Sequence, residues 1–450
     1  MPGGLLTDLY ELNMAVSYLR RGMTGSATFS LSVRKLPKHR GFLVAAGLDD
    51  CLTFLQDFGF AQDDLDYLGS IGFDDRAIED LASLRFDGSV WAVPEGTVVH
   101  AEEPILEVTA PIAVAQLVET VLLNRITLHT TLASKAARYV LAAEGRDLVD
   151  FAFRRTQGSD AAIAAARDSA IVGFVATSNV AAARRYGLQV AGTMAHSFIE
   201  AFPSEEEAFR AFAQDHPTRT TFLVDTYDSL NGVATAIAVA RELGITDRVG
   251  IRLDSGNLDE LARDARAILD EAGLPGARIF ASGGLDEYEV AELVRAQAPV
   301  DAFGVGTQMG VSADAPYLDS VYKLVEYDGR PAMKLSTAKA TAPGEKQIWR
   351  SGGDEGDVLG LRDERAPAFG WEPLLVEVMR DGTRLEAPDP ILRMQHRFQE
   401  ELVRVPTKAK RLSHPEHVEV ERSPALTALT RQTQADALTR AGLTEPRSSD

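Results

Sequence analysis

Two short segments of the sequence carry small residues directly after apolar runs, in a pattern that could bind phosphate. They are "SGG" at residues 282–284 and "GVGT" at residues 304–307. Glycine lets backbone N–H groups approach phosphate oxygens because no Cβ lies in the way. One such segment is often only a tight turn, but two in succession predict a phosphate site. The residues predicted to bind phosphate, which include the "SG" of "IRLDSG", are Ser255, Gly256, Ser282, Gly283, Gly284, Gly304, Gly306 and Thr307.

Charged residues follow other apolar runs in the same part of the chain. Arg154, Arg155 and Arg252 could bind an anion through planar, bidentate hydrogen bonds. In "IRLDSG" the alternation places Arg252 and Asp254 on one face of a strand, so a salt bridge is the alternative role for this arginine. Asp225 and Asp254 could bind the hydroxyls of a ribose, or Mg²⁺ directly or through its waters.

His196 is the histidine whose position is most suggestive of chemistry. It lies in "VAGTMAHSFIEAF" (190–202), after Thr193 and just beyond an apolar run that ends in other polar groups. We interpret the other seven histidines as surface or structural, with His129 the least certain. Spacing alone leaves a catalytic and a core role for His196 both open.

The elements that must position these residues follow a regular rhythm. Short apolar runs alternate with helical stretches such as "NLDELARDARAILDEAG". This alternation predicts parallel β/α units, whose functional groups lie at the carboxyl ends of the strands. The predicted strands are 148–153, 171–177, 188–193, 221–226, 248–255, 278–284 and 301–307. Their number suits a barrel, and none of their ends carries a lysine.

The sequence therefore predicts an α/β fold with an irregular, TIM-like β/α barrel. We expect an N-terminal α+β domain over residues 1–111 and the barrel domain over 112–340, of which 112–145 form a linking helix. Strands are predicted at 27–33 and within 88–111, and an Asp-Gly hairpin at 322–336. Residues 341–450 should pack on the N-terminal domain and complete it, with a charged loop at 342–357 and a helix from about 420 that ends in a frayed tail.

Composition restricts the classes of partner. The 45% hydrophobic and 25% charged content is that of a globular protein, and the net charge of −20 argues against nucleic acid or an anionic membrane. No apolar stretch approaches the roughly 20 residues of a membrane helix. The first residues lack the basic region of a secretory signal, and the single cysteine, Cys51, fits a reducing compartment and a core position. We expect a cytoplasmic protein.

Six motifs, in this order, resemble those of the nicotinate phosphoribosyltransferases, a family of type II phosphoribosyltransferases. They are "LLTDLYELNMA", "FAFRRTQGSD", "SNVAAARRYGLQVAGTMAHSFI", "IRLDSGNL", "FGVGT" and "VYKLVEYDGRPAMKLS". The resemblance extends over roughly residues 5–340. It implies that nicotinate and phosphoribosyl pyrophosphate (PRPP) give nicotinate mononucleotide and pyrophosphate in the salvage of NAD, with Mg²⁺ as cofactor and ATP as a co-substrate hydrolysed during the transfer.

The resemblance also implies roles for individual residues. His196 matches the histidine that ATP phosphorylates transiently, and Arg252 and Asp254 are expected beside it as catalytic residues. Tyr10 matches a tyrosine that stacks on the pyridine ring from the partner subunit of a homodimer with shared active sites. The expected nicotinate-binding residues are Tyr10, Arg154, Thr193 and Arg252. Thr307 matches a position that binds the phosphate of the phosphoribosyl group.

Other functions remain as alternatives. A sister enzyme would act on nicotinamide, which has no carboxylate for the arginines, or on quinolinate, which has two. A Schiff-base aldolase needs a lysine inside the barrel, which the strand ends lack. A phosphosugar isomerase could use Asp225 and Asp254 as bases. A non-catalytic nucleotide sensor would not need the intact set of Tyr10, His196, Arg252 and Thr307.

Overall fold

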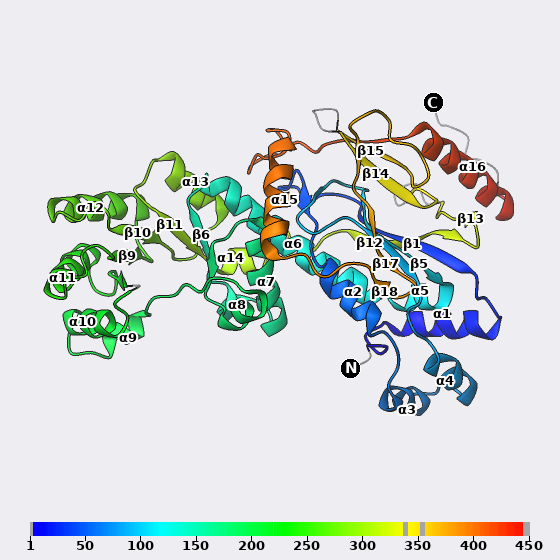
Figure 1. Cartoon of the computed structure of the whole chain (residues 1–450), viewed down its shortest axis with the longest axis horizontal. Coiled ribbons are helices and arrows are strands. Elements are labelled where there is room, and N and C mark those ends of the chain that lie inside the picture. Colours follow the sequence, from blue (N-terminus) through cyan, green and yellow to red (C-terminus); the bar gives the residue numbers. More distant parts are fainter. Residues whose placement is uncertain (1–2, 219, 336–340, 352–355, 444–450) are drawn as a thin grey trace. The chain divides into compact units, whose positions relative to one another are not determined.

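The computed structural model describes residues 3–218, 220–335, 341–351 and 356–443. The chain divides into two units (Figure 1). Unit 1 consists of Met1–Thr131 and Tyr317–Asp450, and unit 2 of Leu132–Pro316. The boundaries between the units lie at 131 and 316, and the long helix α6 (Glu119–Ala143) belongs partly to each unit.

Unit 2 is built on a six-stranded parallel sheet in the order β7-β6-β11-β10-β9-β8. Its strands are β6 (Asp147–Asp150), β7 (Ala176–Thr177), β8 (Thr221–Leu223), β9 (Gly250–Leu253), β10 (Arg278–Ala281) and β11 (Ala302–Val305). Because β7 and β8 are edge strands that do not pair with each other, the described residues form a half-barrel instead of the closed barrel that we expected.

Helices connect these strands, as the β/α alternation predicts. They are η1 (Phe153–Arg155), α7 (Ser159–Val172), α8 (Val180–Tyr186), α9 (His196–Glu200), α10 (Glu205–Asp215), α11 (Ser229–Glu242), α12 (Leu258–Glu271), α13 (Glu287–Arg295) and α14 (Thr307–Gly310). Figure 1 shows α7 to α14 in shades of green around the strands β6, β9, β10 and β11.

Two of the predicted strands of unit 2 are wrong, one in its bounds and one altogether. Ile171 and Val172 end helix α7 and are buried there, and the strand begins only at Ala176. Residues 188–193 form no strand and contribute a single bridge between Val190 and Thr177. A short apolar run in a buried helix has the same composition as a buried strand, so periodicity could not separate them.

Unit 1 contains a seven-stranded antiparallel sheet in the order β13-β12-β1-β5-β3-β17-β18. Its strands are β1 (Ser26–Val33), β3 (Ser89–Ala92), β5 (Pro104–Pro111), β12 (Ser320–Tyr327), β13 (Arg330–Pro331), β17 (Val376–Arg380) and β18 (Thr383–Arg384). The strands β2 (Leu43–Val44) and β4 (Val98–Val99) pair separately. The sheet therefore joins N-terminal strands to strands from beyond residue 316.

The Asp-Gly hairpin is confirmed within the described residues. Tyr327 pairs with Arg330, and the turn residues Asp328 and Gly329 have φ of 50° and 70°. This left-handed conformation is the one that Asp-Gly accommodates in a two-residue turn. The last predicted residue, Ser336, lies outside the described residues.

The predicted charged loop at 342–357 is wrong in part. Its described residues contain β14 (Lys346–Arg350), which pairs with β15 (Asp357–Leu361) in a four-stranded sheet with β16 (Glu372–Pro373) and β19 (Val420–Arg422). Lys346 is buried and pairs with the buried Glu107 of β5 at 2.9 Å. Charged residues are mostly exposed, so a segment that contains a buried, paired lysine has the composition of a solvent-exposed loop.

Helices complete unit 1. They are α1 (Leu9–Arg20), α2 (Leu48–Gln56), α3 (Gln62–Ser70), α4 (Asp75–Ala82), α5 (Ile112–Leu117), α15 (Ile391–Arg404) and α16 (Pro424–Arg440). The predicted linking helix is interrupted between α5 and α6. The C-terminal helix is found at α16, whereas the predicted fraying after it falls outside the described residues.

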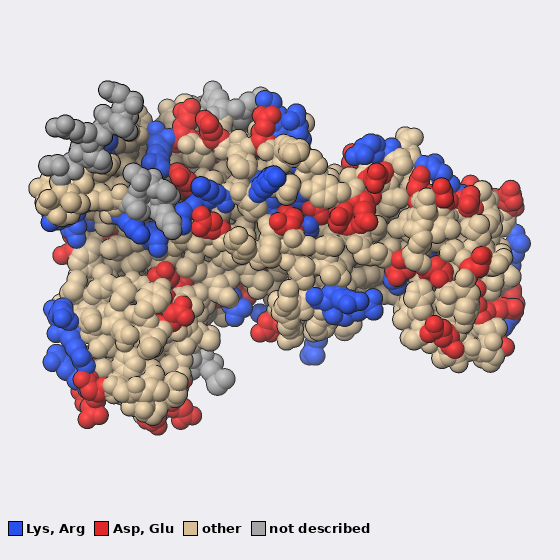
Figure 2. Space-filling model, turned by 180° about the vertical axis from the view of Figure 1, so that it is seen from behind, with Lys and Arg blue, Asp and Glu red and all other residues tan. Residues whose placement is uncertain are grey.

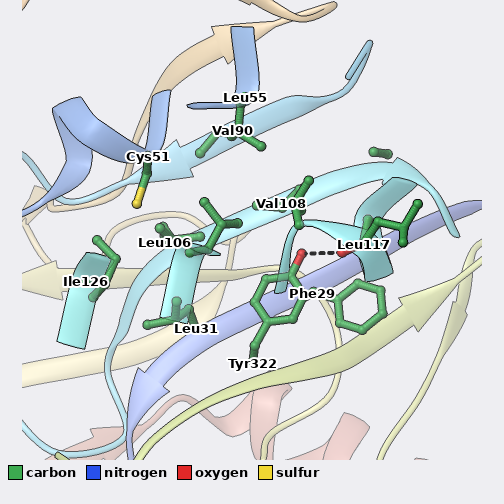
Figure 3. Packing of buried hydrophobic residues seen from close by; sticks show 14 of the residues in the cluster. Phe29, Leu31, Cys51, Leu55, Val90, Leu106, Val108, Leu117, Ile126 and Tyr322 are labelled. Carbon is green, nitrogen blue, oxygen red and sulfur yellow. Dashed lines mark hydrogen bonds between the residues drawn. The ribbon is translucent and has the colours of Figure 1, made fainter. Parts of the chain in front are cut away.

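The hydrophobic core of unit 1 packs around the centre of the seven-stranded sheet (Figure 3). The rings of Phe29 and Tyr322 stack with their centroids 4.7 Å apart, and Leu31 and Val108 lie beside them. Cys51 is buried in the same core, and its burial raises the pKa of the thiol. This cysteine therefore packs as a core residue, as the sequence predicts.

Within the described residues, no helix is long and apolar enough to cross a membrane. Figure 2 shows Lys and Arg side chains interspersed with Asp and Glu side chains over the face in view. That face carries no continuous basic surface, in keeping with the net charge of −20.

Candidate active site

A cavity of about 330 Å³ lies in unit 2 at the carboxyl ends of the parallel strands. Its lining residues are Phe151, Arg154, Arg155, Arg252, Asp254, Ser282, Gly283, Gly284, Gly304, Gly306 and Thr307. The structure thus brings together residues from the ends of β6, β9, β10 and β11, where the parallel sheet predicts a site. A larger cavity of about 820 Å³ is lined mainly by residues from the beginnings of the strands.

Arg252 is the best-anchored side chain of this cavity. Its Nε donates to the Ser282 hydroxyl at 2.7 Å and its Nη1 to the Thr193 hydroxyl at 3.1 Å. Its Nη2 donates to Asp254 Oδ1 at 2.5 Å. Arg252 therefore both forms the salt bridge with Asp254 and lines the cavity. Its three hydrogen bonds fix the plane of the guanidinium.

Phe151 supports this guanidinium and was not identified from the sequence. The centre of the Arg252 guanidinium lies 5.4 Å from the Phe151 ring centroid, a cation–π distance. The ring has room because residue 304 is glycine: a Cβ there would lie 2.7 Å from both Phe151 and Phe280. Gly304 lines the cavity, but this packing is sufficient to explain the glycine without any phosphate. The signal available in the sequence was the aromatic residue inside "LVDFAF".

Gly283 brings two strand ends into direct contact. Its φ is +108°, and a Cβ would lie 1.9 Å from the backbone oxygen of Asp254. Gly284 follows with φ of +85° and open space around it. L side chains rarely adopt these conformations, and both glycines line the cavity.

Two carboxylates differ in how their oxygens are used. Burial opposes the ionisation of Asp254, but the Ser282 hydroxyl and the Arg252 guanidinium lower its pKa overall. Asp225 Oδ2 accepts from the Asp254 N–H at 3.0 Å and from the Ser255 hydroxyl at 2.6 Å. Asp225 Oδ1 is buried and has no hydrogen-bond partner among the described residues. That oxygen is available to a cation or a hydroxyl donor of a ligand.

A divalent cation fits this arrangement only with help from a substrate. The described residues contain no group of three His, Cys, Asp or Glu placed to hold a metal ion. Mg²⁺ is often bound by one or two carboxylates together with phosphates and waters. Asp225, with its unpaired oxygen, and Asp254 are the residues suited to that role.

His196 is the first residue of α9 and is not a core histidine. Its side chain is 41% exposed, with Nε2 3.9 Å from Asp254 Oδ2. Its Nδ1 lies 3.1 Å from the Thr226 hydroxyl, which orients the ring. His196 is therefore an accessible imidazole beside the carboxylate that binds Arg252.

Arg154 and Arg155 lie on the short helix η1 and are exposed at the cavity. Asp150, a buried residue at the end of β6, holds this segment. It accepts from the Ala152 N–H at 2.8 Å and from the Thr177 hydroxyl at 2.6 Å, and burial raises its pKa. Asp150 was not predicted from the sequence, although an aspartate at the end of an apolar run is a visible signal.

Tyr10 is the one predicted site residue that belongs to unit 1. It lies on α1, is 47% exposed, and donates from its hydroxyl to Glu11 Oε1 at 3.1 Å. Burial and the neighbouring carboxylates Glu119 and Glu11 raise the pKa of the phenol, so it stays neutral. Gly256 lies in unit 2 with φ of +86° but does not line the cavity.

Three protein-family models match the sequence in succession. The nicotinate phosphoribosyltransferase (NAPRTase) N-terminal domain matches residues 5–127. The nicotinate phosphoribosyltransferase (NAPRTase) family model matches residues 147–350, and the nicotinate phosphoribosyltransferase C-terminal domain matches residues 362–430.

Individual relatives resemble the chain over most of its length. A nicotinate phosphoribosyltransferase of Mycobacterium tuberculosis is 51% identical over 395 residues, covering 87% of this chain and 84% of the relative. That of Bacillus subtilis is 42% identical over 378 residues, covering 80% and 76%. The crystal structure of human nicotinic acid phosphoribosyltransferase matches with a TM-score of 0.85 at 29% identity, covering 95% of this chain and 99% of that one.

Proposed function

The chain belongs to the nicotinate phosphoribosyltransferase family, and from this premise we propose that it transfers the phosphoribosyl group of PRPP to nicotinate with coupled hydrolysis of ATP. It is an enzyme with nicotinate phosphoribosyltransferase activity, which serves NAD salvage. The observation that carries the residue assignments is the cavity that places Arg252 beside the glycine turns of β10 and β11.

The arginines are assigned to the carboxylate of nicotinate. Arg252 is held flat by three side chains, which suits the planar, bidentate recognition of a carboxylate. Arg154 is exposed at the same cavity, and the Thr193 hydroxyl lies next to Arg252. A preference for nicotinate over nicotinamide follows, since the amide lacks the negative charge.

The glycine turns are assigned to the phosphates of PRPP. Gly283 and Gly284 leave backbone N–H groups accessible, and Gly306 and Thr307 begin α14 on the neighbouring strand end. Backbone amides bind phosphate oxygens without adding to the net charge of the chain. Ser255, whose hydroxyl donates to Asp225, and the adjacent Gly256 are also assigned to the phosphates of PRPP.

The reaction itself requires little covalent chemistry from the protein. The pyridine nitrogen of nicotinate forms a bond to C1 of the ribose, and the C1–O bond to pyrophosphate breaks with its electron pair leaving on pyrophosphate. The neutral ring nitrogen carries no proton, so a general base is not needed. The residues act by positioning the two substrates and by stabilising charge.

Mg²⁺ supplies positive charge to the departing pyrophosphate when it is bound. The carboxylates of Asp225 and Asp254 would hold it, and the unpaired, buried Asp225 Oδ1 supports that assignment. Asp254 is kept ionised by Ser282 and Arg252 and is therefore available as an anionic ligand.

His196 is assigned to the coupling of ATP hydrolysis. A ring nitrogen of His196 takes the γ-phosphoryl group of ATP, and the bond from that phosphorus to ADP breaks. Water later attacks the phosphorus, the N–P bond breaks and phosphate is released, which completes the hydrolysis of ATP. The phosphohistidine adds negative charge and acceptor oxygens beside the loops that bind pyrophosphate. Its accessibility and its fixed orientation toward Thr226 support this role.

The test measures nicotinate mononucleotide formed from nicotinate and PRPP, with and without ATP. We expect wild type to be stimulated by ATP and His196→Ala to keep a basal rate without stimulation. His216→Ala is the matched control, because His216 is an exposed histidine of the same unit that does not line this cavity.

Two results would contradict the proposal. Full ATP stimulation in His196→Ala would contradict the assignment of His196 to the coupling of ATP hydrolysis. If wild type formed no mononucleotide, the assignment of nicotinate and PRPP as substrates would be wrong. Phosphosugar isomerisation would then be assayed on the same preparation.

A further inference from the structure

Three polar side chains of α6 lie buried within unit 2. Lys135, Arg138 and Tyr139 are 2%, 5% and 0% exposed. Residues three and four positions apart share one face of a helix, so these groups form a single polar stripe. Burying a charge costs free energy unless the charge is paired. The partners of these side chains therefore show which segments the stripe contacts.

All three side chains contact the segment that follows β10. The Tyr139 hydroxyl donates to the backbone oxygen of Leu285 at 3.1 Å. Lys135 Nζ donates to Glu287 Oε2 at 2.6 Å, and Arg138 Nε to Glu287 Oε1 at 2.7 Å. Leu285 directly follows the glycine turn, and Glu287 is the first residue of α13.

The same stripe reaches the segment that follows β11. Lys135 Nζ lies 3.0 Å from Asp314 Oδ1, and Arg138 Nε lies 3.9 Å from Asp314 Oδ2. Asp314 comes shortly after α14, which begins at Thr307. Lys135 therefore connects the two segments that follow the glycine turns of β10 and β11.

We infer that Lys135, Arg138 and Tyr139 are positioning residues for PRPP: they hold both glycine turns in the conformation that receives its phosphates. This inference rests on the proposed function, which assigns those turns to phosphate.

The need for such an anchor follows from the turn itself. Gly283 and Gly284 have no side chains to restrain them and adopt left-handed φ values. Gly283 is pressed against the Asp254 backbone on one side, and the Tyr139 bond to Leu285 fixes the other side. A turn held in place before binding avoids the entropic cost of ordering its N–H groups around the phosphate.

The first experiment compares wild type with Tyr139→Phe, which keeps the buried ring and removes only the hydroxyl. We expect the dissociation constant and KM for PRPP to rise by about 3-fold to 10-fold, since one hydrogen bond that orders the turn is lost. The KM for nicotinate and kcat should stay within about twofold of wild type, because the Arg252 side of the cavity is unchanged.

Tyr322→Phe is the matched control. Tyr322 is also a buried tyrosine that donates to a backbone oxygen, that of Ala115 at 2.8 Å, but it belongs to unit 1. It should show a comparable loss of thermal stability without a change in PRPP affinity. An equal rise in the PRPP dissociation constant for both variants would overturn the inference, because the effect would then be one of general stability.

Lys135→Met and Lys135→Arg provide a second test. The methionine should weaken PRPP binding more than Tyr139→Phe, since it loses the ion pairs with both Glu287 and Asp314, and the arginine should restore part of the affinity. Unchanged PRPP affinity in both Tyr139→Phe and Lys135→Met would also overturn the inference.

Direct titration of PRPP without nicotinate, by calorimetry, separates this inference from the proposed function. Wild type that binds PRPP but makes no mononucleotide contradicts the function, while the affinities of the variants still judge the positioning role. Wild type that does not bind PRPP overturns both.

Discussion

Arg252 is oriented by groups from three separate segments of unit 2. Thr193, Asp254 and Ser282 each accept one of its hydrogen bonds, and the Phe151 ring packs against its face. A lysine could reach one of these partners but could not present the same fixed plane of donors. The identity of this one side chain therefore matters for the carboxylate recognition that we propose for it.

Glu205, the first residue of α10, has an environment that disfavours its charge. Burial and the carboxylates of Asp228 and Asp225 raise its pKa to about 6, above the ordinary value of 4.5. The side chain is neutral in both the folded and the unfolded state well below pH 4.5. As the pH rises from there through 6, ionisation becomes more costly in the folded state, so Glu205 destabilises the fold at neutral pH.

Glu205→Gln should therefore raise the melting temperature at pH 7.5 and change it little near pH 4. Thermal unfolding at the two pH values measures the difference. Glu206→Gln is the control, because Glu206 pairs with Arg210 at 2.5 Å and its loss should bring no gain. An equal gain at both pH values for Glu205→Gln would show that charge is not the cause.

At the scale of elements, the glycines at the strand ends have different structural roles. Gly283 permits a close backbone contact, whereas Gly304 makes room for two aromatic rings, one of which, Phe151, lines the cavity. Protein interiors are packed closely enough that one additional methyl group must displace its neighbours. The ring displaced at Gly304 is the one that supports Arg252.

Gly304→Ala should lower kcat/KM for nicotinate by about tenfold or more, as expected when a positioning contact shifts by a fraction of an ångström. Steady-state kinetics with nicotinate varied at saturating PRPP measures this loss. Gly276→Ala, in open space before the neighbouring strand, serves as the control and should behave as wild type. Wild-type kinetics in Gly304→Ala would show that the Phe151 packing is irrelevant to the site.

At the scale of the whole molecule, the predicted site residues are divided between the two units. Tyr10 is half-exposed on α1 of unit 1, while Arg252 and His196 belong to unit 2. The resemblance to the family implies that Tyr10 serves the active site of a partner subunit. We therefore propose a homodimer in which each active site takes residues from both chains.

Mixing two inactive variants tests this assignment. Tyr10→Ala and Arg252→Ala should each be inactive alone. After joint unfolding and refolding in equal amounts, random pairing would give heterodimers with one intact site, and about a quarter of wild-type activity should return. No recovery, with dimers verified by light scattering, would place Tyr10 in the site of its own chain or outside any site.

The sequence by itself determined the local features of this protein. The alternation in "IRLDSG" put Arg252 and Asp254 on one face, the glycines marked the turns after β10 and β11, and Asp-Gly specified the hairpin at 328–329. The strand face, the turns and the hairpin each depend on residues that are neighbours along the chain, so the local spacing and turn preferences predict them.

Only the tertiary structure decided which distant segments meet. The half-barrel stays open, β17 joins β3 across more than 280 positions, Phe151 packs under Arg252, and α6 holds the glycine turns. Such contacts depend on packing and on the pairing of buried charges, and a residue such as Lys135 looks in the sequence like any surface lysine. Its burial and its partners are set by the whole fold, which no local pattern encodes.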